Sequence, residues 1–173
     1  MNEISKQELE DLTKRYQELM ASQQTLLLST ASANSVPDIS YAPFVRDHVG
    51  VFYIYVSEMA SHTANLLNNQ QASILFIRQE SESRNLFARE RAVLNCSVKE
   101  ISRDDAIYAD RTQALQDKFG EVVSVLRSLS DFHLFALHPE NGRYIVGFGR
   151  AFTINIIDGS LLHINSETGK PDN

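Results

Sequence analysis

The first hydrophobic residues of the chain recur with the period of a helix. Leu12, Tyr16 and Leu19 follow one another at spacings of four and three residues, so a helix would carry them on one face. A capping box begins at Ser5, with a glutamate three residues later. The pattern predicts a separate amphipathic helix within residues 1–22.

Beyond this helix, short runs of β-branched and aromatic residues predict strands. A helical stripe interrupts them at residues 102–129, and Phe119-Gly120 breaks that stripe. Asn141-Gly142 and Asp158-Gly159 have the composition of hairpin turns. The predicted strands occupy residues 25–31, 39–45, 51–57, 72–78, 91–101, 131–139, 143–157 and 160–165.

Strands at hairpin spacing with one helical excursion favour an antiparallel barrel over alternating βαβ units. We therefore predict an α+β, mainly β fold: a closed or nearly closed antiparallel β-barrel with flanking helices. The barrel domain would occupy residues 23–165, including the helical excursion at 102–129. Residues 166–173 would form a C-terminal tail.

Composition narrows the kind of ligand. A chain of 173 residues with 43% hydrophobic content can bury one core, and its net charge of -6 argues against nonspecific nucleic-acid binding. No apolar run approaches the roughly 18 residues of a membrane span, and the polar N-terminus is unlike a signal peptide. We expect a soluble, unexported protein with Cys96 as a packed thiol, binding a small or medium-sized ligand.

Two glycines stand out in the last third of the chain. Alternation from Tyr144 onward would place Gly147 and Gly149 on one face of a predicted strand. Glycine weakens a strand, so this pair suggests that a ligand ring or another backbone approaches that face. A tight bend of the barrel, or packing between subunits, is the alternative interpretation.

An arginine cluster is the clearest candidate for binding chemistry. Arg78, Arg84, Arg89 and Arg91 fall within fourteen residues, and guanidinium groups suit bidentate pairing with phosphate or carboxylate. A second interpretation is that these arginines only balance neighbouring acidic charges. The acidic neighbours are Glu80, Glu82 and Glu90.

The five histidines include no pair at the i, i+4 spacing of a helical metal site. His133 and His163 lie in predicted strands, where a hydrogen-bonded core or interface histidine is the common case. His62 follows Ser61, a candidate helix cap, at a junction between strand and helix. The N–H groups of the helix start and a cationic ring could hold an anion there.

Five segments between Thr25 and His163 carry a resemblance to a known family, in order and with nearly matching spacing. They are SYAPFV at 40–45, SEMASHTANLLNN at 57–69, LFARER at 86–91, KFGEVVSVLRSLSDFHLFALHPENG at 118–142 and VGFGRAF at 146–152. These segments resemble the cytoplasmic haem-utilisation proteins of the HutZ and HugZ type. That family belongs to the pyridoxamine 5'-phosphate oxidase-like, FMN-binding split-barrel superfamily.

The resemblance implies a cytoplasmic homodimer of split barrels, active in iron acquisition, with haem at the dimer interface and oxidative haem cleavage. Arg91, with Arg89 beside it, matches the arginine that meets the haem propionates. Asp131 matches the acid that hydrogen-bonds the proximal histidine of the partner subunit. Such an outer carboxylate fixes the tautomer of the histidine and strengthens it as a donor.

The proximal histidine itself is where this chain departs from the family. Family members usually carry it in a C-terminal segment after an acidic-Gly sequence, where this chain has Lys170 after Gly169. Lysine must lose a proton before it can bind iron. His163 is the nearest histidine and is the candidate axial ligand.

The wider superfamily offers an alternative, an FMN-binding oxidoreductase. Its flavin phosphate would be held by Ser57, Ser61, His62 and Arg78, and the flavin ring would lie across the dimer interface. The superfamily often has a lysine where this chain has His62. A third interpretation is a split-barrel dimer that has lost both ligands and acts as an interaction module.

Overall fold

The computed structural model describes residues 4–164. The helices in this range are α1 (Lys6–Ala21), α2 (Ser61–Asn68), α3 (Ala106–Phe119) and α4 (Glu121–Arg127), with short 3-10 helices η1 (Glu80–Glu82) and η2 (Leu86–Ala88). The strands are β1 (Thr25–Ala31), β2 (Pro37–Arg46), β3 (Phe52–Ser57), β4 (Gln71–Ile77), β5 (Arg91–Ile101), β6 (Phe132–Gly147), β7 (Arg150–Ile154) and β8 (Leu161–His163).

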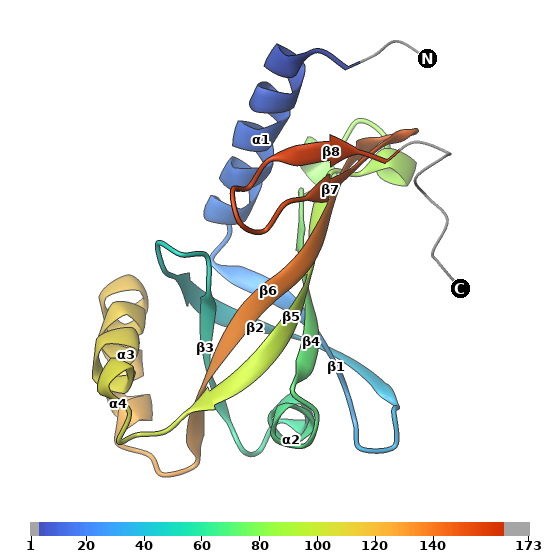
Figure 1. Cartoon of the computed structure of the whole chain (residues 1–173). Helices are drawn as coiled ribbons and strands as arrows, with labels where there is room; N and C mark the ends of the chain where they lie inside the picture. The colour runs from blue at the N-terminus through green and yellow to red at the C-terminus, as the bar shows by residue number, and fades with distance from the viewer. Residues whose placement is uncertain (1–3, 165–173) are drawn as a thin grey trace. The chain divides into compact units, whose positions relative to one another are not determined.

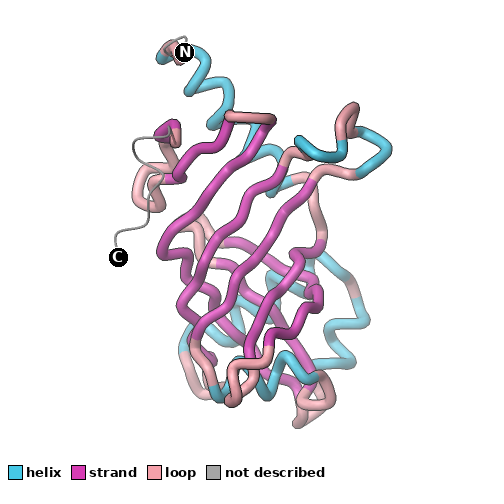
Figure 2. The backbone as a smooth tube through the Cα atoms, turned by 90° about the vertical axis from the view of Figure 1, so that its right-hand side faces the viewer, coloured by secondary structure: helices cyan, strands magenta, loops and turns pink. Residues whose placement is uncertain are grey.

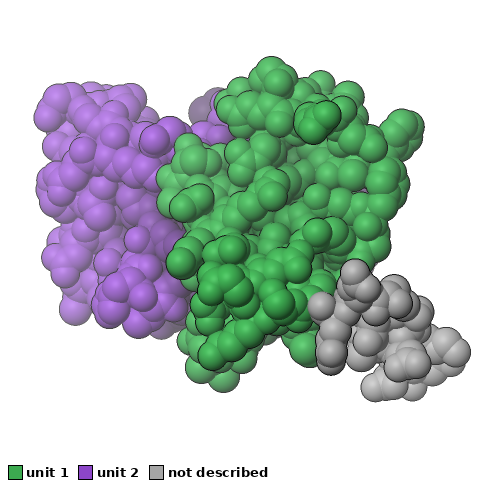
Figure 3. Space-filling model, turned by 90° about the horizontal axis from the view of Figure 1, so that it is seen from above, with its two compact units in different colours: residues 1–23, 75–94, 140–173 green, residues 24–74, 95–139 purple. Residues whose placement is uncertain are grey.

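The chain forms two compact units, coloured separately in Figure 3. The described part of unit 1 comprises residues 4–23, 75–94 and 140–164, and unit 2 comprises residues 24–74 and 95–139. Strands β4, β5 and β6 each continue from one unit into the other along the chain. The two units are described separately below.

Within residues 4–164, the strands form one sheet in the order β3-β2-β1-β4-β5-β6-β7-β8, and β3 also pairs with β6. This last pairing closes β1 to β6 into a six-stranded antiparallel barrel, whose neighbouring strands can be followed in Figures 1 and 2. Strands β7 and β8 extend the sheet beyond β6. The predicted α+β, mainly β barrel with flanking helices is confirmed.

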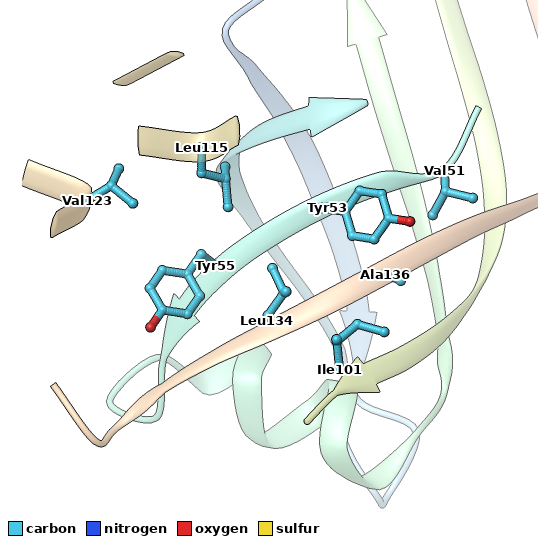
Figure 4. Packing of buried hydrophobic residues seen from close by; sticks show 8 residues of the cluster. All are labelled: Val51, Tyr53, Tyr55, Ile101, Leu115, Val123, Leu134 and Ala136. Atoms are coloured by element: carbon cyan, nitrogen blue, oxygen red, sulfur yellow. The ribbon is translucent and has the colours of Figure 1, made fainter. Parts of the chain in front are cut away.

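The core of unit 2 explains why β3 is hydrophobic at nearly every position. One set of alternate residues, including Tyr53 and Tyr55, packs with Leu115 of α3 and Val123 of α4. Figure 4 shows these side chains together with Leu134 on β6. Because residues on both faces of β3 are buried, the strand reads as a continuous apolar run.

In unit 1, helix α1 uses the predicted apolar stripe. Ser5 caps it, its Oγ accepting the Glu8 backbone N–H at 3.2 Å. Tyr16 is buried, and its hydroxyl donates to the carbonyl oxygen of Gly159 at 2.7 Å. The helix is thereby fastened to the turn between β7 and β8. None of the helices in residues 4–164 is long and apolar enough to cross a membrane.

The predicted hairpin at Asn141-Gly142 is wrong, because β6 runs through it as one strand of 16 residues. Gly142 serves close packing instead of a turn. A Cβ atom there would lie 2.6 Å from Leu94 Cδ2 and 3.1 Å from Ile154 Cδ1. Glycine inside a strand can mark such a close approach.

The prediction that Gly147 and Gly149 lie on one face of a single strand at residues 143–157 is also wrong. These residues contain a hairpin: β6 ends at Gly147, and β7 begins at Arg150. Gly149 lies in the connecting turn with φ of 64°, a conformation that favours glycine. The two glycines therefore do not share a strand face. The Asp158-Gly159 turn is confirmed: it joins β7 to β8 with a φ of 73° at Gly159.

Candidate functional site

A buried carboxylate, Glu90, lies at the centre of the polar side chains of unit 1. It directly precedes β5 and is only 4% exposed. Arg15 of α1 binds it in bidentate fashion, with Nε 2.9 Å from Oε1 and Nη2 2.8 Å from Oε2. Arg78, just after β4, donates from Nε to Oε2 at 2.6 Å, and the Tyr144 hydroxyl donates to Oε1. We call these four residues the Glu90 network.

The charged groups of the Glu90 network stabilise one another's ionised forms. Burial disfavours the charged form of Glu90, but hydrogen bonds from Arg15, Arg78 and Tyr144 outweigh it and hold its pKa below the ordinary value. Burial and the adjacent carboxylate raise the pKa of Tyr144. The network is therefore one carboxylate between two guanidinium groups, with the phenol as a neutral donor.

Next to this network, unit 1 has a surface hollow of about 330 Å³. Its lining includes four arginines and two glutamates, so its formal charge is +2 although the whole chain carries -6. The charged lining residues are Arg15, Arg78, Glu82, Arg84, Arg89 and Glu90. We call this feature the arginine hollow.

Exposed apolar side chains belong to the same segment as the arginine hollow. Asn85 and Ala88 line the hollow, and between them lie Leu86 and Phe87 of η2. Both apolar side chains are exposed, Phe87 by 89%. The segment thus offers apolar surface beside concentrated positive charge, a combination that suits an amphipathic anion.

The predicted arginines differ in how they are engaged. Arg89 donates from Nε to the Arg78 carbonyl oxygen at 2.6 Å and pairs with Glu80 at 3.1 Å. Arg78 and Arg89 are therefore largely engaged in balancing the charges of neighbouring glutamates, as the second interpretation expected. Arg91 donates from Nη1 to the Arg89 carbonyl oxygen at 2.8 Å, and no carboxylate within residues 4–164 pairs with it. Arg84 is exposed at the hollow.

His163 also lies in unit 1, on β8. Its ring packs at 5.2 Å from the ring of Phe152, and its Nε2 lies 3.1 Å from the Gly149 carbonyl oxygen. The side chain is half-buried on the β7–β8 hairpin. Lys170 and the predicted tail of residues 166–173 lie outside the described residues.

In unit 2, Asp131 meets the turn that follows β3. Its Oδ2 accepts a hydrogen bond from Ser57 Oγ at 2.9 Å, and its carbonyl oxygen accepts the Glu58 backbone N–H at 2.8 Å. Ser57 and Asp131, predicted for two different ligands, are thus direct partners. Asp131 is fixed from two sides at the start of β6.

The start of α2 differs from the prediction. Ala60 is the N-cap, without a side-chain capping hydrogen bond, and Ser61 is the first helical residue. Ser61 Oγ donates to Asp38 Oδ2 at 2.6 Å. Burial lowers the pKa of His62, an effect that exceeds the opposing influence of Asp38. A neutral ring beside a carboxylate is poorly suited to hold a phosphate, so the geometry disfavours the anion site expected there.

Sequence reasoning missed Arg15, Tyr144 and the central role of Glu90. Arg15 and Glu90 are 75 residues apart in sequence, and Arg15 looks like any solvated charge of an amphipathic helix. In the sequence, Tyr144 is one apolar position among several in an alternating run, which does not distinguish it from a core residue. No group of three His, Cys, Asp or Glu side chains between residues 4 and 164 is placed to hold a metal ion.

The closed barrel and its helices agree with comparison to known families. Residues 12–146 match the pyridoxamine 5'-phosphate oxidase family. Because this match covers more than half of the chain, the protein belongs to that family of split-barrel proteins.

Two relatives within this fold are particularly informative. Heme oxygenase HutZ of Vibrio cholerae serotype O1 is 35% identical over 144 residues, which cover 83% of this chain and 81% of HutZ. The crystal structure of HutZ, named there a heme storage protein, matches with a TM-score of 0.72 and 34% identity, covering 78% of this chain and 96% of that one. Campylobacter jejuni ChuZ matches with a TM-score of 0.77 and 28% identity, covering 95% of this chain and 66% of ChuZ.

Proposed function

We propose that this protein is a haem-binding, haem-utilisation protein. The observation that carries the proposal is the arginine hollow of net charge +2 beside the exposed apolar side chains of η2. Haem combines an apolar ring with two carboxylates, and these are the two chemistries that the segment offers. The chain is also similar to HutZ, which is named a heme oxygenase and a heme storage protein, and this similarity supports haem as the ligand.

Arg89, which lines the arginine hollow, and Arg91, two residues further along the chain and not part of that lining, would bind the propionates. Arg91 keeps donors free of any carboxylate within residues 4–164, and Arg89 retains Nη2 beyond its bonds to Glu80 and Arg78. The Glu90 network would hold the floor of the hollow rigid, because Arg15 and Arg78 are both committed to Glu90. Rigid guanidinium groups lose less freedom when an anion binds.

His163 is our candidate for the axial ligand of the iron. Neutral imidazole is a common haem ligand. The Gly149 carbonyl oxygen, 3.1 Å from His163 Nε2, can only accept a hydrogen bond, so Nε2 carries the ring proton and Nδ1 has the lone pair that would bind iron. Asp131 of the partner subunit would orient this histidine, as the family resemblance implies. Haem, when bound, supplies iron for oxygen chemistry, and the residues of this chain would hold and orient it.

A homodimer is part of the proposal, and the outer face of the β1–β2 hairpin supports it. Leu27 pairs with Tyr41, and Ser29 with Ile39, which places these side chains on one face. Ile39 is 74% exposed and Tyr41 64% exposed. We infer that a second copy of the chain covers them. Ile39→Lys should shift the mass measured by light scattering from dimer to monomer, whereas Val49→Lys, at an exposed turn, should not.

Hemin titration tests the ligand directly. We expect a Soret band that stays with the protein through gel filtration. Arg91→Ala should weaken affinity about tenfold, the loss expected for one charge-assisted hydrogen bond, and His163→Ala should change the spectrum of the axial ligand. Arg143→Ala, which removes an exposed arginine of β6 that has no proposed contact with haem, is the matched control.

The same experiment separates the alternatives. Flavin absorbance in the purified protein, without a retained Soret band, would favour the FMN alternative. If neither ligand is retained, the haem proposal fails and the interaction-module interpretation remains. If haem binds and His163→Ala leaves the spectrum unchanged, the axial assignment is wrong.

Oxidative haem degradation is the activity that we propose for the bound state. Its relative HutZ is named a heme oxygenase. Loss of the Soret band after addition of ascorbate and oxygen, with catalase present to remove free peroxide, would support it. A stable Soret band under these conditions would limit the protein to haem binding.

A further inference from the structure

His133, at the start of β6, lies between two carboxylates of unit 2. Its Nδ1 is 2.6 Å from Glu100 Oε1, and its Nε2 is 2.8 Å from Glu58 Oε1. Both ring nitrogens can donate only when the imidazole is protonated. The geometry therefore corresponds to an imidazolium that bridges two carboxylates. We call these three residues the His133 bridge.

The His133 bridge and Asp131 share one turn. The Glu58 carboxylate accepts a hydrogen bond from Nε2 of His133. The Glu58 backbone N–H donates to the Asp131 carbonyl oxygen at 2.8 Å. Its neighbour Ser57 donates to the Asp131 carboxylate at 2.9 Å. The turn that supplies both donors to Asp131 is thus fastened through His133 to Glu100 on β5.

We propose that His133 is a positioning residue for Asp131. Through Glu58 and Glu100 it holds the turn of residues 57–58 in place, and that turn holds Asp131. This inference rests on the proposed function in one respect, namely that Asp131 orients the axial histidine of the partner. The positioning itself concerns only contacts within unit 2 and can be tested without haem.

Loss of one proton would open the bridge. Neutral imidazole has one donor and one acceptor, so one carboxylate would then face a ring nitrogen that cannot donate. Glu58 and Glu100 are partly exposed and can turn to water. Release of Glu58 would loosen the turn and free Asp131 Oδ2 from its fixed partner.

The charged surroundings of His133 favour protonation. Burial opposes the charged ring, but the hydrogen bonds that His133 donates to Glu100 and Glu58 outweigh it and raise the pKa of His133 above its ordinary value. Arg103 and Tyr108 share with His133 the lining of a hollow of about 380 Å³. Asp131 lies two residues before His133, just ahead of β6. Arg103 is occupied by backbone carbonyl oxygens, among them that of Leu129 at 2.6 Å.

Nuclear magnetic resonance on the haem-free protein tests the positioning. We expect Glu100→Gln to lower the pKa of His133 by about one unit, because an opposite charge in contact shifts a pKa by roughly 1–3 units. His133→Gln should change the side-chain carboxyl shift of Asp131 and its dependence on pH. His138→Gln, an exposed histidine of the same strand, should change neither.

The outcomes separate the two proposals. If the carboxyl signal of Asp131 is identical in the wild type and in His133→Gln at every pH, the positioning role is overturned whether or not haem binds. If that signal moves but hemin is not retained, the positioning stands and the haem function fails. With haem bound, Glu100→Gln should move the pH midpoint of the axial-ligand spectrum downward, as it moves the pKa of His133. An unmoved midpoint would contradict coupling to the haem.

Should His133→Gln misfold, Glu58→Gln provides a second variant. It keeps an oxygen acceptor for His133 but removes the charge, so the turn can retain its shape. We expect an intermediate change in the Asp131 signal. A wild-type Asp131 signal, together with a lowered pKa of His133, would also contradict the proposal.

Discussion

The Glu90 network of unit 1 and the His133 bridge of unit 2 both place one charged group between two groups of opposite charge, and the signs of the charges are reversed between them. In the first, one carboxylate lies between two guanidinium groups. In the second, one imidazolium lies between two carboxylates. The central side chains differ in exposure, with Glu90 at 4% and His133 at 18%. The outer partners are partly exposed in both clusters, with Arg15 at 51% and Arg78 at 31% against Glu58 at 57% and Glu100 at 44%.

The difference in exposure between the two central side chains decides what each arrangement can do. A buried charge that loses its partner stays in a medium of low dielectric constant, so removing one member is costly. Half-exposed carboxylates can exchange their partner for water at small cost. The Glu90 network should therefore act as a permanent support, and the His133 bridge as a contact that protonation can make or break.

Glu90→Ala should give the largest effect. It leaves the guanidinium groups of Arg15 and Arg78 in mutual repulsion and the buried hydroxyl of Tyr144 without its acceptor. We expect the free energy of unfolding in urea to fall by about 3 kcal/mol, because several hydrogen bonds to a buried carboxylate are lost and the Tyr144 hydroxyl is left unsatisfied. Glu82→Ala removes a more exposed partner of Arg78 and should cost less than about 1 kcal/mol. Equal losses in the two variants would remove the distinction between buried and exposed pairs.

Tyr144→Phe should have the next largest effect. The change removes one donor to a buried carboxylate and leaves both arginines in place, so we expect a loss of about 2 kcal/mol. Tyr55→Phe provides a control in unit 2, because the Tyr55 hydroxyl forms its hydrogen bond with the neutral hydroxyl of Tyr108 at 3.1 Å. A larger loss for Tyr55→Phe would show that the charge on Glu90 adds little to its hydrogen bond with Tyr144.

Sequence patterns were sufficient for elements whose signal is local. The stripe of α1, the break between α3 and α4 at Gly120 and the turn at Gly159 all depend on neighbouring residues. Asn141-Gly142 was wrongly predicted to be a turn, because Gly142 instead leaves space for the side chains of Leu94 and Ile154. A local sequence pattern does not contain such a long-range contact. Glu90 meets its partners through contacts up to 75 residues apart, so the arginines were identifiable but their arrangement was not.

The acid dependence of stability should identify Glu90. Because its folded pKa lies below the ordinary value of 4.5, its contribution is present above about pH 4.5 and is lost as pH falls through the folded pKa. The difference in unfolding free energy between wild type and Glu90→Gln should therefore shrink below about pH 4.5. Effects of other carboxylates are common to both proteins and cancel. A difference that stays constant down to pH 2 would show that Glu90 is not ionised in the fold.

The His133 bridge should give the smallest effect, with the opposite dependence on pH. Its raised folded pKa means that its contribution is full below the unfolded value of 6.5 and is lost as pH rises through the folded pKa. His133→Gln should cost about 0.5–1 kcal/mol at pH 6 and progressively less above the folded pKa, while His138→Gln should show no such trend. If the loss is instead the same at every pH, the ring stabilises the fold by stacking on Phe135, whose centroid lies 6.2 Å away. The bridge would then be a packing contact, and its likeness to the Glu90 network would be one of geometry without electrostatic content.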